Sequence, residues 1–134
     1  MSYSINAIRN FKIGNLMDYS GDWGVTFHNE EDWISIDWYS NSVTLVREAI
    51  EKYAPKIDGF DVLPSFGEID LEQSMNKSEA EWIEKSLPNP SDCLEIFKKN
   101  SILSKAQAEE HRAYSKLLWL YEKWSEGFSI FISY

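Results

Sequence analysis

Alternating apolar and polar positions mark the β-strands of this chain. Apolar residues stand at every second position from Trp23 to Phe27 and again from Ile34 to Trp38, which is the period of a strand with one buried face. The polar segment 29–32 between these runs is rich in turn-forming residues. The pattern therefore predicts a hairpin of adjacent antiparallel strands over residues 23–39, with the carboxylates of segment 29–32 at its tip.

The last residues of the sequence have the same period. Phe128, Ile130, Ile132 and Tyr134 would share one face of a strand. A strand this apolar must pair inside the sheet, because an unpaired one would promote aggregation. We therefore expect the C-terminal segment to return beside the N-terminal hairpin, and we also expect an N-terminal strand.

Spacings of three and four residues between apolar positions predict helices elsewhere. This spacing occurs over residues 43–53 and 114–124, and two Ser residues begin capping-box patterns, Ser78 with Glu81 and Ser104 with Gln107. The expected helices are 43–54, 78–87, a short one from Ser91 to Asn100, and a long one over 105–125 that Gly127 terminates.

Together these elements predict an α+β fold, in which an antiparallel β-sheet has several helices packed against it. The segment 58–70 contains Gly59, Pro64 and Gly67 and is expected to be a loop. A chain of 134 residues is long enough for one hydrophobic core, and no linker or repeat divides it. We therefore predict a single domain over residues 1–134.

The chain is acidic, with a formal net charge of −9 at pH 7. The first 95 residues carry a net charge of −11, with 18 acidic and 7 basic side chains, and the remaining residues carry +2. No Lys or Arg occurs between Lys12 and Arg47, or between Lys56 and Lys77. These two windows contain the carboxylates Asp18, Asp22, Glu30, Glu31, Asp32, Asp37, Asp58, Asp61, Glu68, Asp70 and Glu72.

This distribution of charge argues against direct binding to nucleic acid or to an anionic membrane, because both require clustered Lys and Arg. It suits a basic protein as the partner, since opposite charges on two surfaces speed their association. An acidic surface that serves only solubility is the alternative explanation.

Signatures of catalysis are weak by comparison. The sequence has no phosphate-binding loop, nucleophile elbow or zinc-protease motif, and its only histidines are His28 and His111. A strand end explains His28, and the border of an apolar stripe explains His111. We therefore expect no catalytic residue, no bound metal and no cofactor.

Cys93 is the only cysteine, which rules out an intramolecular disulfide and suits a reducing compartment. A structural thiol is the expected role of this residue. The sequence has neither the pattern of a signal peptide nor an apolar run approaching the ~18 residues of a membrane span. These features predict a cytoplasmic protein.

One aromatic residue is a candidate anchor for a partner. Strict alternation places Trp33 on the face opposite Ile34 and Ile36, so its indole is either exposed or covered by a second layer of structure. An exposed Trp among carboxylates is typical of protein interfaces, where large aromatic side chains supply much of the binding energy.

These observations lead to the hypothesis of a small acidic binding protein that neutralises a basic partner protein, as an immunity protein inhibits a nuclease or other toxin. The resemblance is one of size, charge and aromatic content. The predicted partner-binding residues are Asp18, Asp22, Glu30, Glu31, Asp32, Trp33, Asp37, Asp58, Asp61, Glu68 and Asp70.

Three alternatives compete with this hypothesis. A phage-type DNA mimic would present carboxylates to a defence enzyme, at roughly the spacing of phosphates. A hydrolase would use convergent carboxylates, with or without a metal held with His28 or His111. A scaffold subunit would add its C-terminal strand to the sheet edge of a neighbour.

Overall fold

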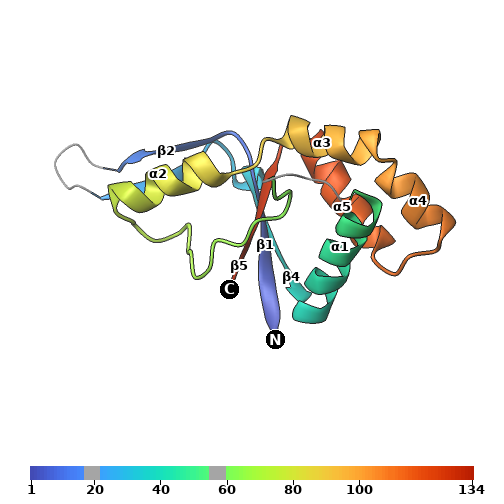
Figure 1. Ribbon diagram of the computed structural model, residues 1–134. Helices are drawn as coiled ribbons and strands as arrows, with labels where there is room; N and C mark the ends of the chain where they lie inside the picture. Colours follow the sequence, from blue (N-terminus) through green and yellow to red (C-terminus); the bar gives the residue numbers. More distant parts are fainter. Residues whose placement is uncertain (17–21, 55–59) are drawn as a thin grey trace.

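A three-stranded antiparallel sheet lies at the centre of the molecule (Figure 1). The computed structural model describes residues 1–16, 22–54 and 60–134. Strand β1 (Ser2–Ile8) is in the middle, with β4 (Trp33–Tyr39) on one side and β5 (Ser129–Ser133) on the other. The predicted α+β class and both predicted terminal strands are confirmed.

A second, two-stranded sheet extends from the first. It consists of β2 (Phe11–Asn15) paired antiparallel with β3 (Trp23–Phe27). Because β1 leads directly into β2, and β3 leads through segment 28–32 into β4, the four strands form one long hairpin with a bend in the middle. We call the part made of β2 and β3 the ribbon.

The bend arises because the two sides of the hairpin differ in length. The amide of His28 donates to the carbonyl of Asn10 at 3.2 Å, and the amide of Arg9 donates to the carbonyl of Asp32 at 2.9 Å. The three residues between these contacts on one side, 29–31, therefore have no counterpart on the other. They bulge outward, as extra residues in a strand do, and turn the ribbon away from the central sheet.

The predicted hairpin of residues 23–39 is therefore wrong. The two apolar runs belong to different sheets, since β3 pairs with β2 and β4 pairs with β1. Segment 29–32 forms only a single turn, the 3-10 helix η1 (Glu30–Asp32), and Trp33 leaves it in an extended conformation. The chain thus continues past the turn without reversing, because the long N-terminal segment 2–15 supplies partners for both runs.

Hydrophobic cores lie on both faces of the central sheet. One face carries Ile5, Ile36 and Ile132 toward a core that the helices α1, α3, α4 and α5 complete. The other face carries Ile8 and Phe131 toward a smaller core with the ribbon and α2. Figure 1 shows the two groups of elements on opposite sides of β1 and β5.

Three helices match the predicted positions closely. They are α1 (Ser40–Tyr53), α2 (Lys77–Ser86) and α3 (Pro90–Lys99). The cap of α2 lies earlier than predicted, because Asn76 accepts a hydrogen bond from the Glu79 amide at 2.8 Å and donates one to the Glu79 carboxylate at 2.8 Å. Asn supplies this cap as well as Ser would, so the predicted box at Ser78 is not used.

The predicted long helix over 105–125 is in fact two helices, α4 (Ile102–Ala108) and α5 (Tyr114–Ser125). Between them, Glu110 has a left-handed backbone with φ of 51°, which ends the first helix. The proposed cap at Ser104 is wrong, since this residue lies inside α4. Gly127, with φ of 91°, follows the end of α5 as predicted.

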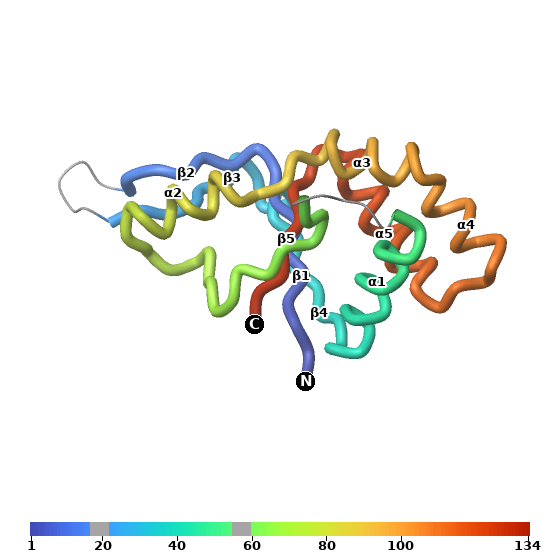
Figure 2. The backbone as a smooth tube through the Cα atoms, viewed as in Figure 1, coloured from blue at the N-terminus to red at the C-terminus, as the bar shows by residue number. Residues whose placement is uncertain are grey.

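The outer edge of β5 is covered by segment 64–67. Ile132 donates its amide to the carbonyl of Pro64 at 2.8 Å and accepts from the amide of Phe66 at 2.8 Å, and Tyr134 donates to Gly67 at 2.9 Å. The C-terminal strand is therefore enclosed between β1 and this segment. Figure 2 shows the two chain ends close together, as the antiparallel pairing of β1 with β5 requires.

An ion pair fixes the bend of the hairpin. The guanidinium of Arg9 donates to the buried carboxylate of Asp32 at 3.0 Å and to the carbonyl of Glu126 at 2.9 Å. It also lies over the ring of Phe128, 4.3 Å from its centroid. Arg9 thereby joins the bend to the residues that connect α5 with β5.

We expect Asp32→Ala to destabilise the protein strongly, because it leaves Arg9 without its partner at a partly buried position. The melting temperature should fall on the order of 5–10 °C. Thermal unfolding followed by circular dichroism measures this. The control is Glu31→Ala at the exposed neighbouring position, which should shift the midpoint by no more than about 2 °C. Equal shifts for the two variants would contradict the structural role of Asp32.

Candidate partner-binding surface

The bulge at the bend presents two acidic side chains to solvent. Glu30 and Glu31 are both exposed, and neither side chain forms an ion pair or hydrogen bond within the part of the chain that the structure describes. Their position follows from the fold, because residues 29–31 are the extra residues of the bulge. These two predicted site residues are therefore free to contact a partner.

Asp32, by contrast, points into the protein. It is 1 % exposed and accepts hydrogen bonds from Arg9 at 3.0 Å, Asn10 at 3.3 Å and the amide of Asn29 at 3.0 Å. Burial alone would raise the pKa of this carboxyl, but the three donors together hold its pKa below the ordinary value. The expectation that the three consecutive carboxylates form one exposed tip is wrong for Asp32.

An aromatic hollow lies beside the bulge. Its volume is about 500 Å³, and it is lined by Phe27, His28, Asn29, Glu30 and Trp33. The rings of Phe27 and Trp33 stack with centroids 5.5 Å apart. A carboxylate thus stands at the rim of an apolar hollow, and this is an arrangement that can receive a side chain with an apolar stem and a positive end.

Trp33 combines both of the roles that the sequence left open. Its indole is half-buried, and its Nε1 donates to Oδ1 of Asn6 at 3.2 Å. The same ring faces the hollow and packs against the smaller core. Trp33 is therefore held in a fixed orientation before any partner arrives, which limits the entropy lost on binding.

Strand β4 adds an acidic residue and an aromatic one to this surface. Asp37 is exposed and accepts a hydrogen bond from Ser4 at 3.4 Å. Tyr39 is 75 % exposed, and alternation places it on the same face of the strand as Trp33 and Asp37. We call Glu30, Glu31, Trp33, Asp37 and Tyr39 the bend surface.

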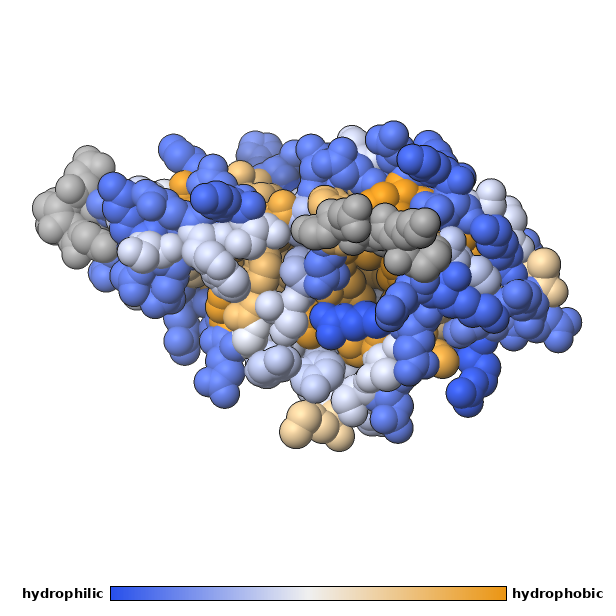
Figure 3. Space-filling model, viewed as in Figure 1, coloured by the Kyte–Doolittle hydropathy of each residue, from blue (hydrophilic) through white to orange (hydrophobic). Residues whose placement is uncertain are grey.

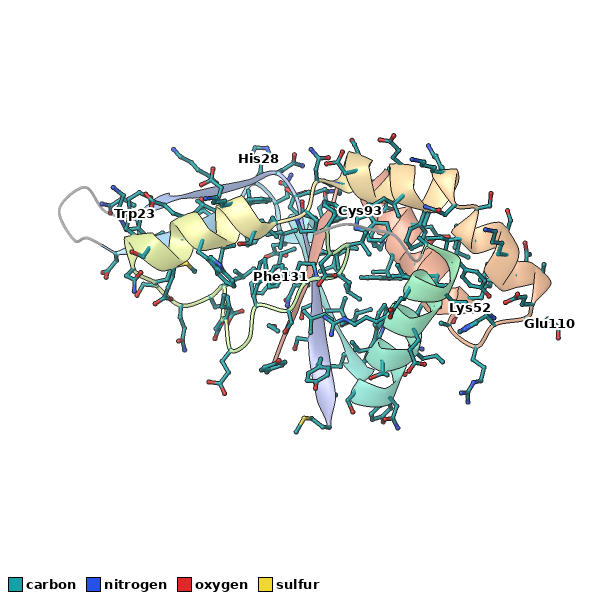
Figure 4. All side chains as sticks on the ribbon, viewed as in Figure 1. Trp23, His28, Lys52, Cys93, Glu110 and Phe131 are labelled. Atoms are coloured by element: carbon teal, nitrogen blue, oxygen red, sulfur yellow. The ribbon has the colours of Figure 1, made fainter. Side chains whose placement is uncertain are left out.

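The remaining predicted carboxylates do not join the bend surface. Asp22 precedes β3 at the far end of the ribbon, which a strand of five residues places roughly 15 Å from the bend. Figure 4 shows Trp23, which follows Asp22, and His28, which lies near the bend, at opposite ends of this strand. Asp18 and Asp58 lie outside the described residues.

The other three acids lie on the segment between α1 and α2. Asp61 accepts from the amide of Leu63 at 3.0 Å, and Asp70 accepts from the amide of Glu72 at 2.9 Å. Both bonds stabilise local turns. Glu68 is exposed and follows Gly67, which pairs with the end of the chain. The predicted site residues are therefore distributed over several places.

A second cavity lies between α1 and segment 60–65. It has a volume of about 610 Å³, and apolar side chains are visible in the hollow at the centre of Figure 3. Its lining includes Arg47, Glu51 and Asp61, and Arg47 donates to the carbonyl of Leu63 at 2.9 Å. The charges here have mixed sign, so this cavity does not extend the acidic surface.

A polar cluster joins α1 to the connection between α4 and α5. Glu109 accepts hydrogen bonds from the hydroxyl of Tyr53 and from Lys52, the latter at 2.9 Å. The bond from Tyr53 and the one from Lys52 hold the pKa of Glu109 below its ordinary value, and the same bonds raise the pKa of Tyr53 and of Lys52. These contacts fix the break between α4 and α5 against α1.

The histidines and the cysteine have structural surroundings. Nδ1 of His111 accepts a hydrogen bond from the amide of Ala113 at 3.0 Å. The ring of His111 lies edge-on to the ring of Tyr53, with centroids 6.1 Å apart. His28 is exposed at the end of β3. Cys93 is fully buried, and this burial, with smaller effects of Asp92 and Asp61, raises the pKa of its thiol to about 12.

The described residues contain no group of three or more His, Cys, Asp or Glu side chains placed to hold a metal ion. The carboxyl groups with shifted pKa in this part of the chain, Asp32 and Glu109, are both bonded to other elements of the fold. The shifts at these positions therefore have a structural cause.

The sequence patterns do not identify two residues at this site. One is Tyr39, which belongs to the bend surface, and the other is Phe27, which lines the hollow beside it. The alternation of Trp33, Asp37 and Tyr39 was a signal for their shared face, but the position of Phe27 beside Trp33 depends on the bend. That bend was not predicted.

The chain matches no protein-family model, no curated protein and no solved structure. In the described parts of the chain, every helix is too short or too polar to cross a membrane.

The cluster around Glu109 predicts a loss of stability in acid. A carboxyl whose pKa is lowered by folding stabilises the protein above its unfolded pKa, and this contribution disappears as the pH falls through the lower folded value. Glu109→Gln should therefore have a lower melting temperature than the wild type at pH 7, and the difference should shrink as the pH falls below the ordinary pKa of a Glu carboxyl.

Melting temperatures across the range from pH 2 to pH 8 check this. Glu110→Gln is the matched control, because its exposed side chain has no bond to α1, and it should follow the wild type at every pH. A difference for Glu109→Gln that stays constant with pH would show that charge is not involved.

Proposed function

We propose that this protein is an inhibitor that binds a basic partner protein through the bend surface. The observation that supports the proposal is the pair of exposed carboxylates at the bulge, Glu30 and Glu31, beside the hollow formed by Phe27 and Trp33. Charge and apolar area are adjacent here, and this combination is typical of protein interfaces.

The two parts of the surface would act at different stages of binding. Exposed carboxylates attract a cationic partner over a distance of about 8–10 Å at physiological salt, and they raise the association rate. The stacked rings of Phe27 and Trp33 then give the complex its buried apolar area, which slows dissociation.

A toxin that acts on nucleic acid fits the role of the partner. Such a protein is cationic where it binds phosphate, so an acidic inhibitor can cover that site. We therefore favour an inhibitor of the toxin-immunity type, acting in the cytoplasm, which the single cysteine also suits. The partner need not be a nuclease, because any basic surface has the same complementarity.

One observation favours a second version of this proposal. Asp22, the bulge and Asp37 occur in succession along a single bent hairpin, so the acids follow an elongated path. An antagonist that mimics DNA would use such a row of charges against a defence enzyme. In that version Asp22 contributes to binding, whereas the inhibitor that we favour needs only the bend surface.

Affinity capture with the tagged protein tests the proposal. The wild type should retain one basic protein in stoichiometric amount from a lysate of the source cells, and a high-salt wash should release part of it. Recovery of no specific protein at low salt would count against inhibition by charge and would favour an enzyme or a scaffold.

We expect Glu30→Lys with Glu31→Lys to slow association with the captured protein by about tenfold or more at low salt. Surface plasmon resonance at several salt concentrations measures this, and the difference from wild type should shrink as salt rises. The matched control changes the charge equally at exposed positions elsewhere, through Glu84→Lys with Glu95→Lys. Equal slowing by both double variants would mean that overall charge, not the bend surface, determines association.

A further inference from the structure

Strand β4 has an unpaired edge. Among the described residues, its only neighbour in the sheet is β1. Backbone hydrogen bonds mark the two ends of the β1–β4 pair. The amide of Ser40 donates to the carbonyl of Met1 at 3.0 Å, and the amide of Arg9 donates to the carbonyl of Asp32 at 2.9 Å. Since bonded pairs alternate in an antiparallel ladder, Ile34, Ile36 and Trp38 direct their backbone groups toward β1.

The intervening residues of β4 direct their backbone groups outward. These are Trp33, Ser35, Asp37 and Tyr39. The amide of Trp33 already donates to the carbonyl of Glu30 within the turn, and no other described segment pairs with the outward edge that the four residues form. Ser35, Asp37 and Tyr39 are all exposed. The edge is therefore open to solvent over most of the seven-residue strand.

Of the other sheet edges in the described structure, that of β5 is paired and that of β3 is paired at its start. Segment 64–67 pairs with the outer side of β5, and Met75 forms two backbone hydrogen bonds with Trp23 at the start of β3, at 2.7 and 2.9 Å. Natural proteins protect open edges with Lys, Pro or a bulge inside the strand. β4 has none of these, and Asp37 is its only charged residue.

We propose that β4 is a strand-addition site, where an extended, cationic segment of the partner protein pairs with the open edge. This inference rests on the proposed function and assigns its binding mode. Backbone hydrogen bonds from Ser35 and Asp37 would supply affinity without regard to sequence. The side chains around them would then select for positive charge.

Charge decides which strand fits this edge. Asp37 lies on it, and Glu30 and Glu31 precede it in the bulge. Lys116, whose Nζ lies 5.9 Å from the centroid of the Trp38 ring, is on the opposite face of the sheet from Asp37. A Lys or Arg placed opposite Asp37 would therefore gain a favourable cross-strand pair.

A second copy of this chain is a poor partner for the open edge of β4, because its charge has the same sign. Two molecules that each carry a formal charge of −9 would repel, and pairing β4 with itself would bring their acidic bulges to the same interface. A cationic segment avoids this repulsion and also reaches the hollow beside Trp33, at the start of the strand.

The test uses a blocked octapeptide of alternating lysine and valine as the probe, observed by NMR on the ¹⁵N-labelled protein. Amide shifts should change mainly over residues 33–39, and hydrogen exchange should slow at Ser35 and Asp37. One control peptide replaces two central lysines by proline and gains one lysine at each end, so its charge is unchanged but two of the amides that would face β4 are lost. A second control alternates glutamate with valine. Both controls should bind at least tenfold more weakly.

A variant of the protein completes the test. Ser35→Pro removes an outward amide and none of the bonds to β1, a position where sheets tolerate proline. It should weaken binding of the lysine peptide by tenfold or more, with a melting temperature close to that of the wild type. If the variant does not fold, the comparison between the lysine peptide and its proline-containing control on the wild-type protein decides the question.

Three results would overturn strand addition. These are shift changes confined to other surfaces, equal affinity for the proline-containing peptide, and exchange protection of Ser35 that rises with protein concentration in the absence of peptide. The last result would indicate a second copy at the edge. The proposed function fails separately, if the double variant Glu30→Lys with Glu31→Lys retains the captured partner as well as the wild type does.

Discussion

The ion pair between Arg9 and Asp32 is the interaction on which the arrangement of this protein depends. It closes the bend at which one long hairpin leaves the central sheet and becomes the ribbon. The same guanidinium bonds the carbonyl of Glu126 and covers Phe128, so it joins the hairpin to the last helix and the last strand. The bulge that carries Glu30 and Glu31 arises from the extra residues 29–31, and the ion pair holds the end of this segment against the opposite strand. The stability of the fold and the exposure of the acids therefore have a common origin.

Local patterns predicted the elements well where one period dominated. Alternation located β3, β4 and β5, a spacing of three and four residues located α1, and the helices predicted over 78–87 and 91–100 match α2 and α3. The errors arose where a distant partner decided the outcome. Segment 29–32 has the composition of a hairpin turn, yet β4 pairs with β1, because residues 2–8 provide a complete partner strand. Residues 109–113 favour a helix by composition, yet the bonds of Glu109 to Tyr53 and Lys52 accompany a break.

The same limit applies to the candidate surface. Glu30, Glu31 and Asp32 are equivalent in the sequence, and only the position of Arg9 on the opposite strand separates the buried member from the two exposed ones. The many acidic residues in the two windows without Lys or Arg indicated a basic partner. Their number could not distinguish carboxylates that stabilise turns, such as Asp61 and Asp70, from carboxylates that are free to contact a partner. The aromatic hollow was unpredictable for a related reason, since Phe27 and Trp33 stack only after the bulge has formed.

The central position of β1 has a consequence for how the chain reaches its fold. β1 is made first, yet one of its two neighbours, β5, comes from residues 129–133. Pairing across such a separation raises the contact order, which slows folding. During synthesis from the N-terminus, β1 can pair with β4 early. The other edge of β1 stays unpaired until residues 129–133 have left the ribosome. Until β5 has been synthesised, the smaller core also lacks Phe131. The nascent hairpin therefore has an incomplete apolar face, which a chaperone could bind.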